Sequence, residues 1–188
     1  MDRKATQNRN PGVASILLAL VMAAMPLSAA ADRLFLMMDE VRGEIRAPDG
    51  RFLIEIVSYA QSTTGPIGSG ATSGAAGKAV CGPVSVTKYV DVASPDLLLY
   101  ALNGEHVRQA VITFLRPGPR PVEYYKVTLN DVIVAAVSQG TSNGSDRATE
   151  NVTLMARQFR YEYTQQDATG KLGARVNSGW DCVAGRKL

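Results

Sequence analysis

The sequence holds few side chains of the kinds that enzymes use for acid–base or nucleophilic chemistry. His106 is the only histidine and therefore the only candidate for an imidazole general base. No Gly-x-Ser-x-Gly motif supplies a nucleophile for it, and a Ser-His-Asp mechanism needs several correctly placed partners. Because His106 follows a predicted helix, where a histidine gains from the helix dipole, we interpret it as structural and expect no catalytic residues.

Metal and cofactor sites also lack the required spacing. One histidine and two distant cysteines offer no short pair of zinc ligands. The stretch 64–77 is rich in glycine but lacks the Gly-Lys-Ser/Thr ending of a P-loop. It also lacks the strand-to-helix context of a dinucleotide site. We therefore interpret it as a loop, and we expect neither a metal nor a cofactor.

Two groups of side chains could belong either to a site or to ordinary surface and core. Carboxylates near the first predicted turns have no spacing that selects a catalytic pair, so solvated surface charge is the better interpretation. They are Asp39, Glu40, Glu44, Asp49 and Glu55. Aromatic residues along two later segments could line a carbohydrate groove, but their alternation is more typical of core and cross-strand pairs. They are Tyr124, Tyr125, Phe159, Tyr161 and Tyr163.

Cys81 and Cys182 are the only cysteines and lie far apart in the sequence. In an exported protein an even number of cysteines permits one disulfide. Closing a loop of about 100 residues would stabilise the fold by up to about 4.7 kcal/mol in the chain-entropy treatment. Two separate buried thiols are the alternative, and the choice depends on how far apart the two Cα atoms lie.

Residues 1–31 have the pattern of a Sec signal peptide. Three basic residues among the first ten precede an apolar run over 13–27, and small residues follow at 28–31. The run is shorter than the roughly 20 residues of a membrane-spanning helix. We therefore expect a cleaved leader, export, no stable membrane insertion and a mature domain over 32–188.

The mature segment has the length of one domain and is close to electrically neutral. Without the leader it carries 17 basic and 16 acidic residues, so the basic character of the full chain comes partly from its first residues. No cluster of lysine and arginine with interleaved aromatic residues occurs. Nucleic-acid binding is therefore not indicated.

The clearest element is a short helix over Ser94–Asn103. Ser94 is a favoured N-cap, Pro95 suits the first helical position, and Asn103-Gly104 supplies a left-handed exit. The segment is apolar nearly all round, so we expect it to be buried on more than one side.

The rest of the mature chain is dominated by β-forming segments. We predict strands over 33–41, 51–59, 80–92, 107–116, 123–129, 132–138, 151–165 and 174–183. We also expect a kink or bulge at 130–131, and a slip of the alternation at 157–158. This pattern of strands with a single short helix predicts an all-β fold, a barrel or a sandwich. Closure would remove the exposed strand edges.

Short motifs along the mature chain together resemble Hcp, the haemolysin-coregulated protein family of bacterial type VI secretion systems. The motifs are Gly43-Glu44, T-K-Y-V-D at 87–91, Ser94-Pro95, L-L-L at 97–99, Gly104-Glu105-His106, Ala110-Val111, Glu123-Tyr124, Asp131-Val132, Thr149-Glu150-Asn151-Val152 and Gly179-Trp180-Asp181. Each motif is short, and their order and spacing carry the resemblance.

The resemblance implies a closed or nearly closed antiparallel β-barrel of two packed sheets with one flanking helix. It also implies a secreted, virulence-related protein without catalytic, cofactor or metal-binding residues. Members form hexameric rings that stack into a tube, act with the spike and sheath proteins, and hold small effectors as cargo. The leader and the two cysteines depart from the family pattern. They favour an alternative, a Sec-exported monomeric β-domain that binds a surface or host ligand without a role in a tube.

Overall fold

The computed structural model describes residues 31–65, 79–118, 121–167 and 171–188. Almost all of the predicted leader and of the glycine-rich loop lies outside these ranges, as do residues 119–120 and 168–170. The described elements, in chain order, are β1 (Arg33–Met38), β2 (Ile45–Arg46), β3 (Phe52–Ile56), β4 (Ser58–Thr64), β5 (Val80–Tyr89), α1 (Ser94–Asn103), β6 (His106–Arg116), β7 (Val122–Gly140), β8 (Thr149–Gln166), β9 (Leu172–Asp181) and β10 (Arg186–Lys187).

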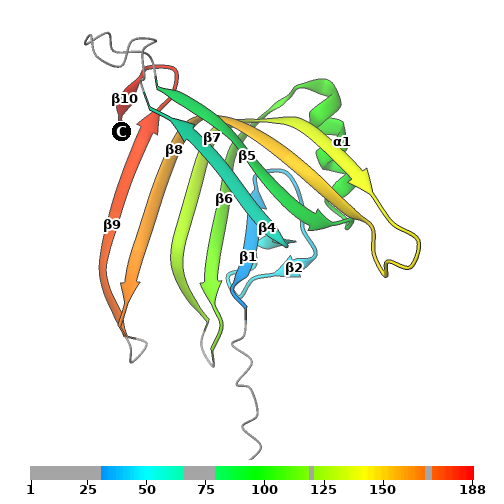
Figure 1. Cartoon of the computed structure of the whole chain (residues 1–188), viewed down its shortest axis with the longest axis horizontal. Helices are drawn as coiled ribbons and strands as arrows, with labels where there is room; N and C mark the ends of the chain where they lie inside the picture. The colour runs from blue at the N-terminus through cyan, green and yellow to red at the C-terminus, as the bar shows by residue number, and fades with distance from the viewer. Residues whose placement is uncertain (1–30, 66–78, 119–120, 168–170) are drawn as a thin grey trace, which may run out of the picture.

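The strands form an antiparallel sheet that is folded into two layers. One layer follows the order β10-β9-β8-β7-β6-β1-β3-β2. The other contains β4 and β5, which cross in front of β6 to β9 in Figure 1. The layers are joined through β8, which pairs with β5 as far as Leu154 and with β9 from Gln158 onward. The predicted all-β fold with one short helix is confirmed, and the sheet is not closed.

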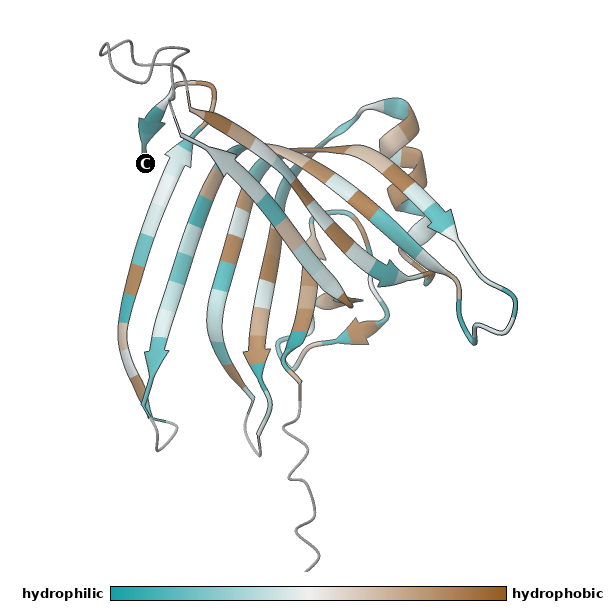
Figure 2. Cartoon of the chain, in the orientation of Figure 1, coloured by the Kyte–Doolittle hydropathy of each residue, from teal (hydrophilic) through white to brown (hydrophobic). Residues whose placement is uncertain are grey.

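A bend crosses the long strands at the place where the sequence predicted irregularity. Buried side chains alternate along β7 and β8, but the phase of the alternation changes midway along each strand. Figure 2 shows hydrophobic and hydrophilic residues as bands along the strands. The buried positions are Val127 and Leu129, then Val132 and Val134, in β7, and Val152 and Leu154, then Phe159, in β8. Asn130 pairs with Gln158, so both strands change phase at the same level. The register is unbroken across this bend and shifts by one residue only between Val134 and Ala136. Asp131 takes a positive φ of 55° at this bend.

The predicted strand over 51–59 is wrong in one respect, because it is two strands in different layers. In β3, Ile56 pairs with Leu34 of β1, whereas in β4, Ser58 pairs with Thr87 of β5. Val57 lies at the crossing and is 53% exposed. The uninterrupted run of β-forming residues hides this change of partner, since both halves have extended backbone. Conversely, the segments predicted over 123–129 and 132–138 form one strand, β7.

The ends of α1 confirm one predicted cap and correct the other. Gly104 has a left-handed φ of 67°, and its N–H donates to the Tyr100 carbonyl. At the start, however, the N-cap residue is Ala93, and no side chain caps the first turn. The hydroxyl of Ser94 is engaged elsewhere, because it takes part in the buried network described below.

Expected burial of α1 on more than one side is wrong for the single chain. Leu97 is fully buried and faces the sheet side, where α1 contacts β7. Leu98, Leu99 and Leu102 are 42%, 57% and 77% exposed. The helix therefore presents an apolar face to solvent, which we call the leucine face.

A search of the described residues for a membrane-spanning helix, which needs a long apolar segment, finds none.

Candidate functional site

His106, the candidate base, lies on the surface at the start of β6. Its Nδ1 is 2.5 Å from Oδ1 of Asp131, and its side chain is 57% exposed. Asp131 sits at the bend of β7, so the pair links the first residue of β6 to that bend. The structural role of His106 stays a prediction.

The predicted surface carboxylates are separated, each with a partner of its own. Asp39 binds Arg108, Glu40 accepts a hydrogen bond from Tyr100, Glu44 accepts one from the Val92 N–H, Asp49 binds Arg51, and Glu55 binds Arg33. Within the described part of the chain, no group of three or more His, Cys, Asp or Glu side chains could hold a metal ion.

A buried ion pair that the sequence analysis missed lies between β5, β8 and the start of α1. Lys88 is completely buried, and its ammonium group is 2.6 Å from Glu150 Oε1 and 2.7 Å from Asp91 Oδ1. It also donates to the Tyr89 carbonyl at 2.8 Å and to the Ser94 hydroxyl at 3.2 Å. Ser94 is the first residue of α1, Asp91 lies just before the helix, and Glu150 lies on β8. The Lys88 network therefore fixes the start of the helix to the sheet.

The electrostatics of this centre favour the charged form of Glu150. Burial acts to raise the pKa of the carboxyl, but hydrogen bonds from Lys88, Gln139 and Ser94 outweigh burial, and the pKa lies below its ordinary value. Gln139 donates to the second carboxylate oxygen at 2.8 Å. Every polar group of the pair is thereby satisfied, as a buried charge requires.

Strand alternation was the signal that could have revealed Lys88. Val84, Val86 and Lys88 occupy alternate positions of β5, and all three are fully buried. A lysine in phase with two core valines must bring a buried anion with it. The anion was Glu150, in phase with Val152 on the neighbouring strand β8.

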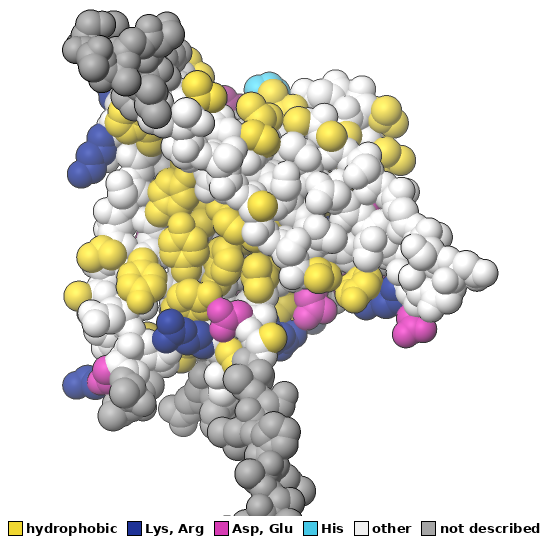
Figure 3. Space-filling view, in the orientation of Figure 1, with side chains coloured by type: hydrophobic (Ala, Val, Ile, Leu, Met, Phe, Trp, Pro, Cys, Tyr) yellow, Lys and Arg dark blue, Asp and Glu magenta, His cyan; other side chains and the backbone are white. Residues whose placement is uncertain are grey.

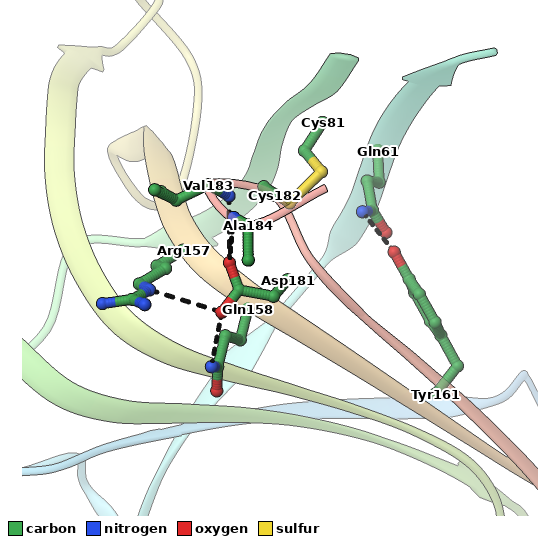
Figure 4. The surroundings of a disulfide bond; sticks show 9 residues. All are labelled: Gln61, Cys81, Arg157, Gln158, Tyr161, Asp181, Cys182, Val183 and Ala184. Atoms are coloured by element: carbon green, nitrogen blue, oxygen red, sulfur yellow. Dashed lines mark hydrogen bonds and ion pairs between the residues drawn. A yellow bond between two sulfur atoms is a disulfide. The ribbon is translucent and has the colours of Figure 1, made fainter. Parts of the chain in front are cut away.

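At the far end of the two layers, a disulfide joins β5 to the residue after β9, and a satisfied carboxylate lies beside the disulfide (Figure 4). Cys81 at the start of β5 is bonded to Cys182 just after β9, with Cα atoms 6.0 Å apart. Next to it, Asp181 accepts hydrogen bonds from the N–H groups of Val183 and Ala184 and from Gln158. Of the two alternatives for the cysteines, the structure contains the disulfide.

Asp181 should make stability depend on pH in the acid range. The Ala184 N–H and Gln158 hydrogen bonds lower its pKa from 3.8 to about 2. Because the folded pKa is depressed, this stabilisation is present above about pH 4 and is lost as the pH falls toward 2. We expect Asp181→Asn to lower the urea midpoint at pH 6, with the difference from wild type shrinking toward pH 2.

The matched control for this prediction is Asp146→Asn, in an exposed turn. Urea unfolding followed at several pH values should give the same pH dependence for the control and the wild type. A difference between Asp181→Asn and wild type that stays constant from pH 6 to pH 2 would contradict the assignment.

The predicted aromatic residues divide between the core and an uncovered surface. Phe159 is only 2% exposed, whereas Tyr163 is 39% exposed. Figure 3 shows a patch of hydrophobic side chains where the front layer leaves β7 to β9 uncovered. We call this surface the aromatic trough, and it is formed by Tyr59, Phe114, Tyr125, Tyr161, Tyr163 and Val176.

The trough is continuous and uncharged at its lining. The Tyr59 and Phe114 rings meet edge to face with centroids 5.2 Å apart, and Phe114 lies 5.1 Å from Tyr125. Gln61 accepts a hydrogen bond from Tyr59 and donates one to Tyr161. Burial raises the pKa of Tyr59 well above its ordinary value, so its hydroxyl stays protonated and available as a donor.

Comparison with known proteins identifies relatives over most of the chain. Residues 35–163 match the family "Type VI secretion system effector, Hcp". The chain is similar to Protein hcp1 of Pseudomonas aeruginosa strain PAO1, with 43% identity over 100 residues, which are 52% of this chain and 62% of the relative. The match thus spans less than two thirds of that relative's length.

Solved structures agree with the sequence match. A structure described as a type six secretion system protein superposes with a TM-score of 0.77 and 25% identity, covering 84% of this chain and all of the other. Hcp1 from Salmonella typhimurium gives a TM-score of 0.70 and 29% identity, covering 85% of this chain and all of the other. The chain belongs to the Hcp effector family of the type VI secretion system.

Proposed function

We propose that this protein is a ring-forming structural subunit of a type VI secretion tube, which is secreted and carries effector cargo rather than catalysing a reaction. Family membership supports a role in this secretion system. Its partners would be further copies of the chain, in a hexameric ring and in stacked rings, together with spike and sheath proteins and small effectors. Residues 1–31 would be a cleaved leader, and residues 32–188 the functional domain.

The observation that carries the ring proposal is the leucine face of α1. Three leucines on one surface of a ten-residue helix are 42–77% exposed. A monomer gains nothing from such a patch, whereas a subunit interface would bury it. In a ring, one surface of each subunit meets a different surface of its neighbour. The leucine face would be one of these two surfaces.

Light scattering after size-exclusion chromatography tests the ring. We expect the mature wild-type chain at micromolar concentration to have the mass of a hexamer. Leu102→Glu places a charge on the most exposed leucine, 77% accessible, and should shift the mass to that of one chain. The variant should keep the circular-dichroism spectrum of a folded β-protein, and its thermal midpoint should fall only by the stabilisation that association supplies.

The control is Asn103→Asp, which adds the same charge to the same turn without removing apolar surface. It should leave the hexamer intact. A wild-type chain that is strictly monomeric would contradict the ring and favour the exported monomeric domain, which the disulfide and the leader pattern support.

A further inference from the structure

Strand β5 is held differently along its two halves. Residues 84–89 pair with β4 on one side and with β8 on the other. Residues 80–83 have β4 as their strand partner, but they pair with neither β8 nor any other strand within the described part of the chain. Residues 62–64 and 80–83 therefore form a two-stranded extension of the front layer, which we call the terminal ribbon. A ribbon of two strands has little stability of its own in water.

The side chains of the terminal ribbon bury little surface. Val84 and Val86, further along β5, are fully buried. The exposed residues of the ribbon are Ser62, Thr63, Thr64, Val80 and Pro83. Residues of both layers line a hollow of about 360 Å³, and they are Thr63, Ala79, Cys81, Phe159, Tyr161 and Trp180. Space for several water molecules thus lies between the ribbon and the strands behind it, so packing holds the ribbon only weakly.

A covalent bond and a hydrogen-bonded tyrosine connect the ribbon to the other layer (Figure 4). Cys81 of the ribbon is bonded to Cys182, whose own N–H donates to the Arg157 carbonyl at 2.8 Å. The hydroxyl of Tyr161, on β8, accepts a hydrogen bond from the Gln61 amide at 2.6 Å, just before the ribbon. The disulfide is the stronger of these connections, and it is the one that a chemical reaction can open.

A small thiol can reach the disulfide, because both cysteines are half-buried rather than enclosed. The thiolate of a dithiol reductant attacks one sulfur atom, which forms a mixed disulfide and releases the other cysteine as a thiolate. The second thiol of the reductant then closes the reductant's own disulfide and releases the first cysteine. Two electrons and two protons pass from the reductant to Cys81 and Cys182, and no other co-reactant is needed.

We propose that the Cys81–Cys182 disulfide is a redox-sensitive latch on the terminal ribbon. In the oxidised chain it holds the ribbon against β8 and β9. When a thiol reductant breaks the bond, the ribbon detaches while residues 84–89 stay in the sheet, and the aromatic lining of the hollow becomes accessible. Cytosolic thiols favour the open form, and an oxidising compartment favours the closed form. This proposal goes beyond ring assembly and does not depend on it.

Hydrogen–deuterium exchange with mass spectrometry tests the latch, on the mature chain before and after reduction with dithiothreitol. The measured quantity is the exchange rate of the ribbon amides divided by that of the amides in 84–89. We expect this ratio to rise by about tenfold or more on reduction, because the ribbon opens locally. A ratio that stays the same or falls would show that the disulfide stabilises only the chain as a whole, and would overturn the proposal.

The variant Cys81→Ala/Cys182→Ala is the control for the reductant. Its exchange ratio should equal that of the reduced wild type, with and without dithiothreitol. A variant whose ratio equals that of the oxidised wild type would contradict the latch, because its ribbon would be closed without the bond.

Tyr161→Phe removes the hydroxyl that meets Gln61 and keeps the ring. In the oxidised chain the exchange ratio should stay as in the wild type, since the disulfide still holds the ribbon. In the reduced chain the ratio should rise above that of the reduced wild type. Tyr163→Phe, two residues along the same strand, is the matched control and should change neither form. Equal effects of Tyr161→Phe on the oxidised and reduced chains would show that the disulfide does not control this opening.

Collisional quenching by acrylamide tests whether the hollow becomes accessible. Trp180 is the only tryptophan and lines the hollow, so the quenching constant reports its contact with solvent. The constant should rise on reduction of the wild type and should be equally high in Cys81→Ala/Cys182→Ala. A constant that does not change on complete reduction would mean that the ribbon still covers the hollow, and the proposal would fail.

Discussion

Lys88→Ala is expected to lower the free energy of unfolding by about 3–5 kcal/mol, because it leaves a buried carboxylate without its countercharge. Lys88 and the Glu150 side chain are both fully buried, with 2.6 Å between the ammonium nitrogen and Oε1. Removal of the ammonium also frees the Ser94 hydroxyl and the Asp91 carboxylate from their shared donor. The loss is a large fraction of the roughly 5–15 kcal/mol by which folded domains are stable.

Denaturant unfolding at pH 7 gives the measurement, and Lys126→Ala is the matched control. Lys126 also bridges two carboxylates, Glu123 and Glu162, but its side chain is 24% exposed. We expect a cost of about 1 kcal/mol or less for a pair that water still screens. Similar losses in the two variants would contradict a special role for the buried pair.

A double variant separates the charge from the packing. In Lys88→Met/Glu150→Leu both charges are replaced by apolar groups of similar size, and such replacements are often close to neutral. We expect most of the stability lost in Lys88→Ala to return. If Lys88→Ala does not fold, the double variant still tests the argument, because it too should fail to fold if the ion pair itself is required.

The Lys88 network explains why the sequence predicted the C-terminal cap of α1 correctly and the N-terminal cap wrongly. Gly104 ends the helix through its own backbone conformation and one bond to Tyr100, so neighbouring residues suffice to predict it. Ser94 has the sequence of a cap, yet its hydroxyl donates to Glu150, 56 residues away. Only the folded chain brings that stronger acceptor within reach.

The alternation of apolar and polar residues predicted the strands, but it did not predict which parts of the sheet lie under β4 and β5. The phase changes at 130–131 and 157–158 were visible in the sequence because they interrupt the β-forming and apolar pattern, and they proved to be a single bend. The aromatic alternation in β8 predicted core equally for Phe159 and Tyr163. Their exposures of 2% and 39% differ because β4 and β5 cross the sheet above one and not the other. That crossing depends on the change of layer at Val57, where the local sequence gives no signal.

Removing the disulfide should lower the free energy of unfolding by about 2–4 kcal/mol. The bond joins residues 101 apart in sequence, so its loss enlarges the conformational freedom of the unfolded chain considerably. It also connects β5 to the turn after β9, near the level at which β8 exchanges one partner for the other. Thermal unfolding of Cys81→Ala/Cys182→Ala against wild type gives the measurement, at about 2–4 °C for each kcal/mol.

Chemical reduction of the Cys81–Cys182 disulfide in the wild type provides an independent way to obtain the protein without this bond. A reductant should lower the wild-type midpoint to near that of the double variant and leave the variant itself unchanged. Trp180 and Cys81 line the same hollow, so tryptophan fluorescence should change on reduction before global unfolding. An unchanged wild-type midpoint on complete reduction would contradict the stabilising role. Since cytosolic thiols are kept reduced, this stabilisation would be acquired only by chains that reach an oxidising compartment, which is the destination that the leader pattern at 1–31 predicts.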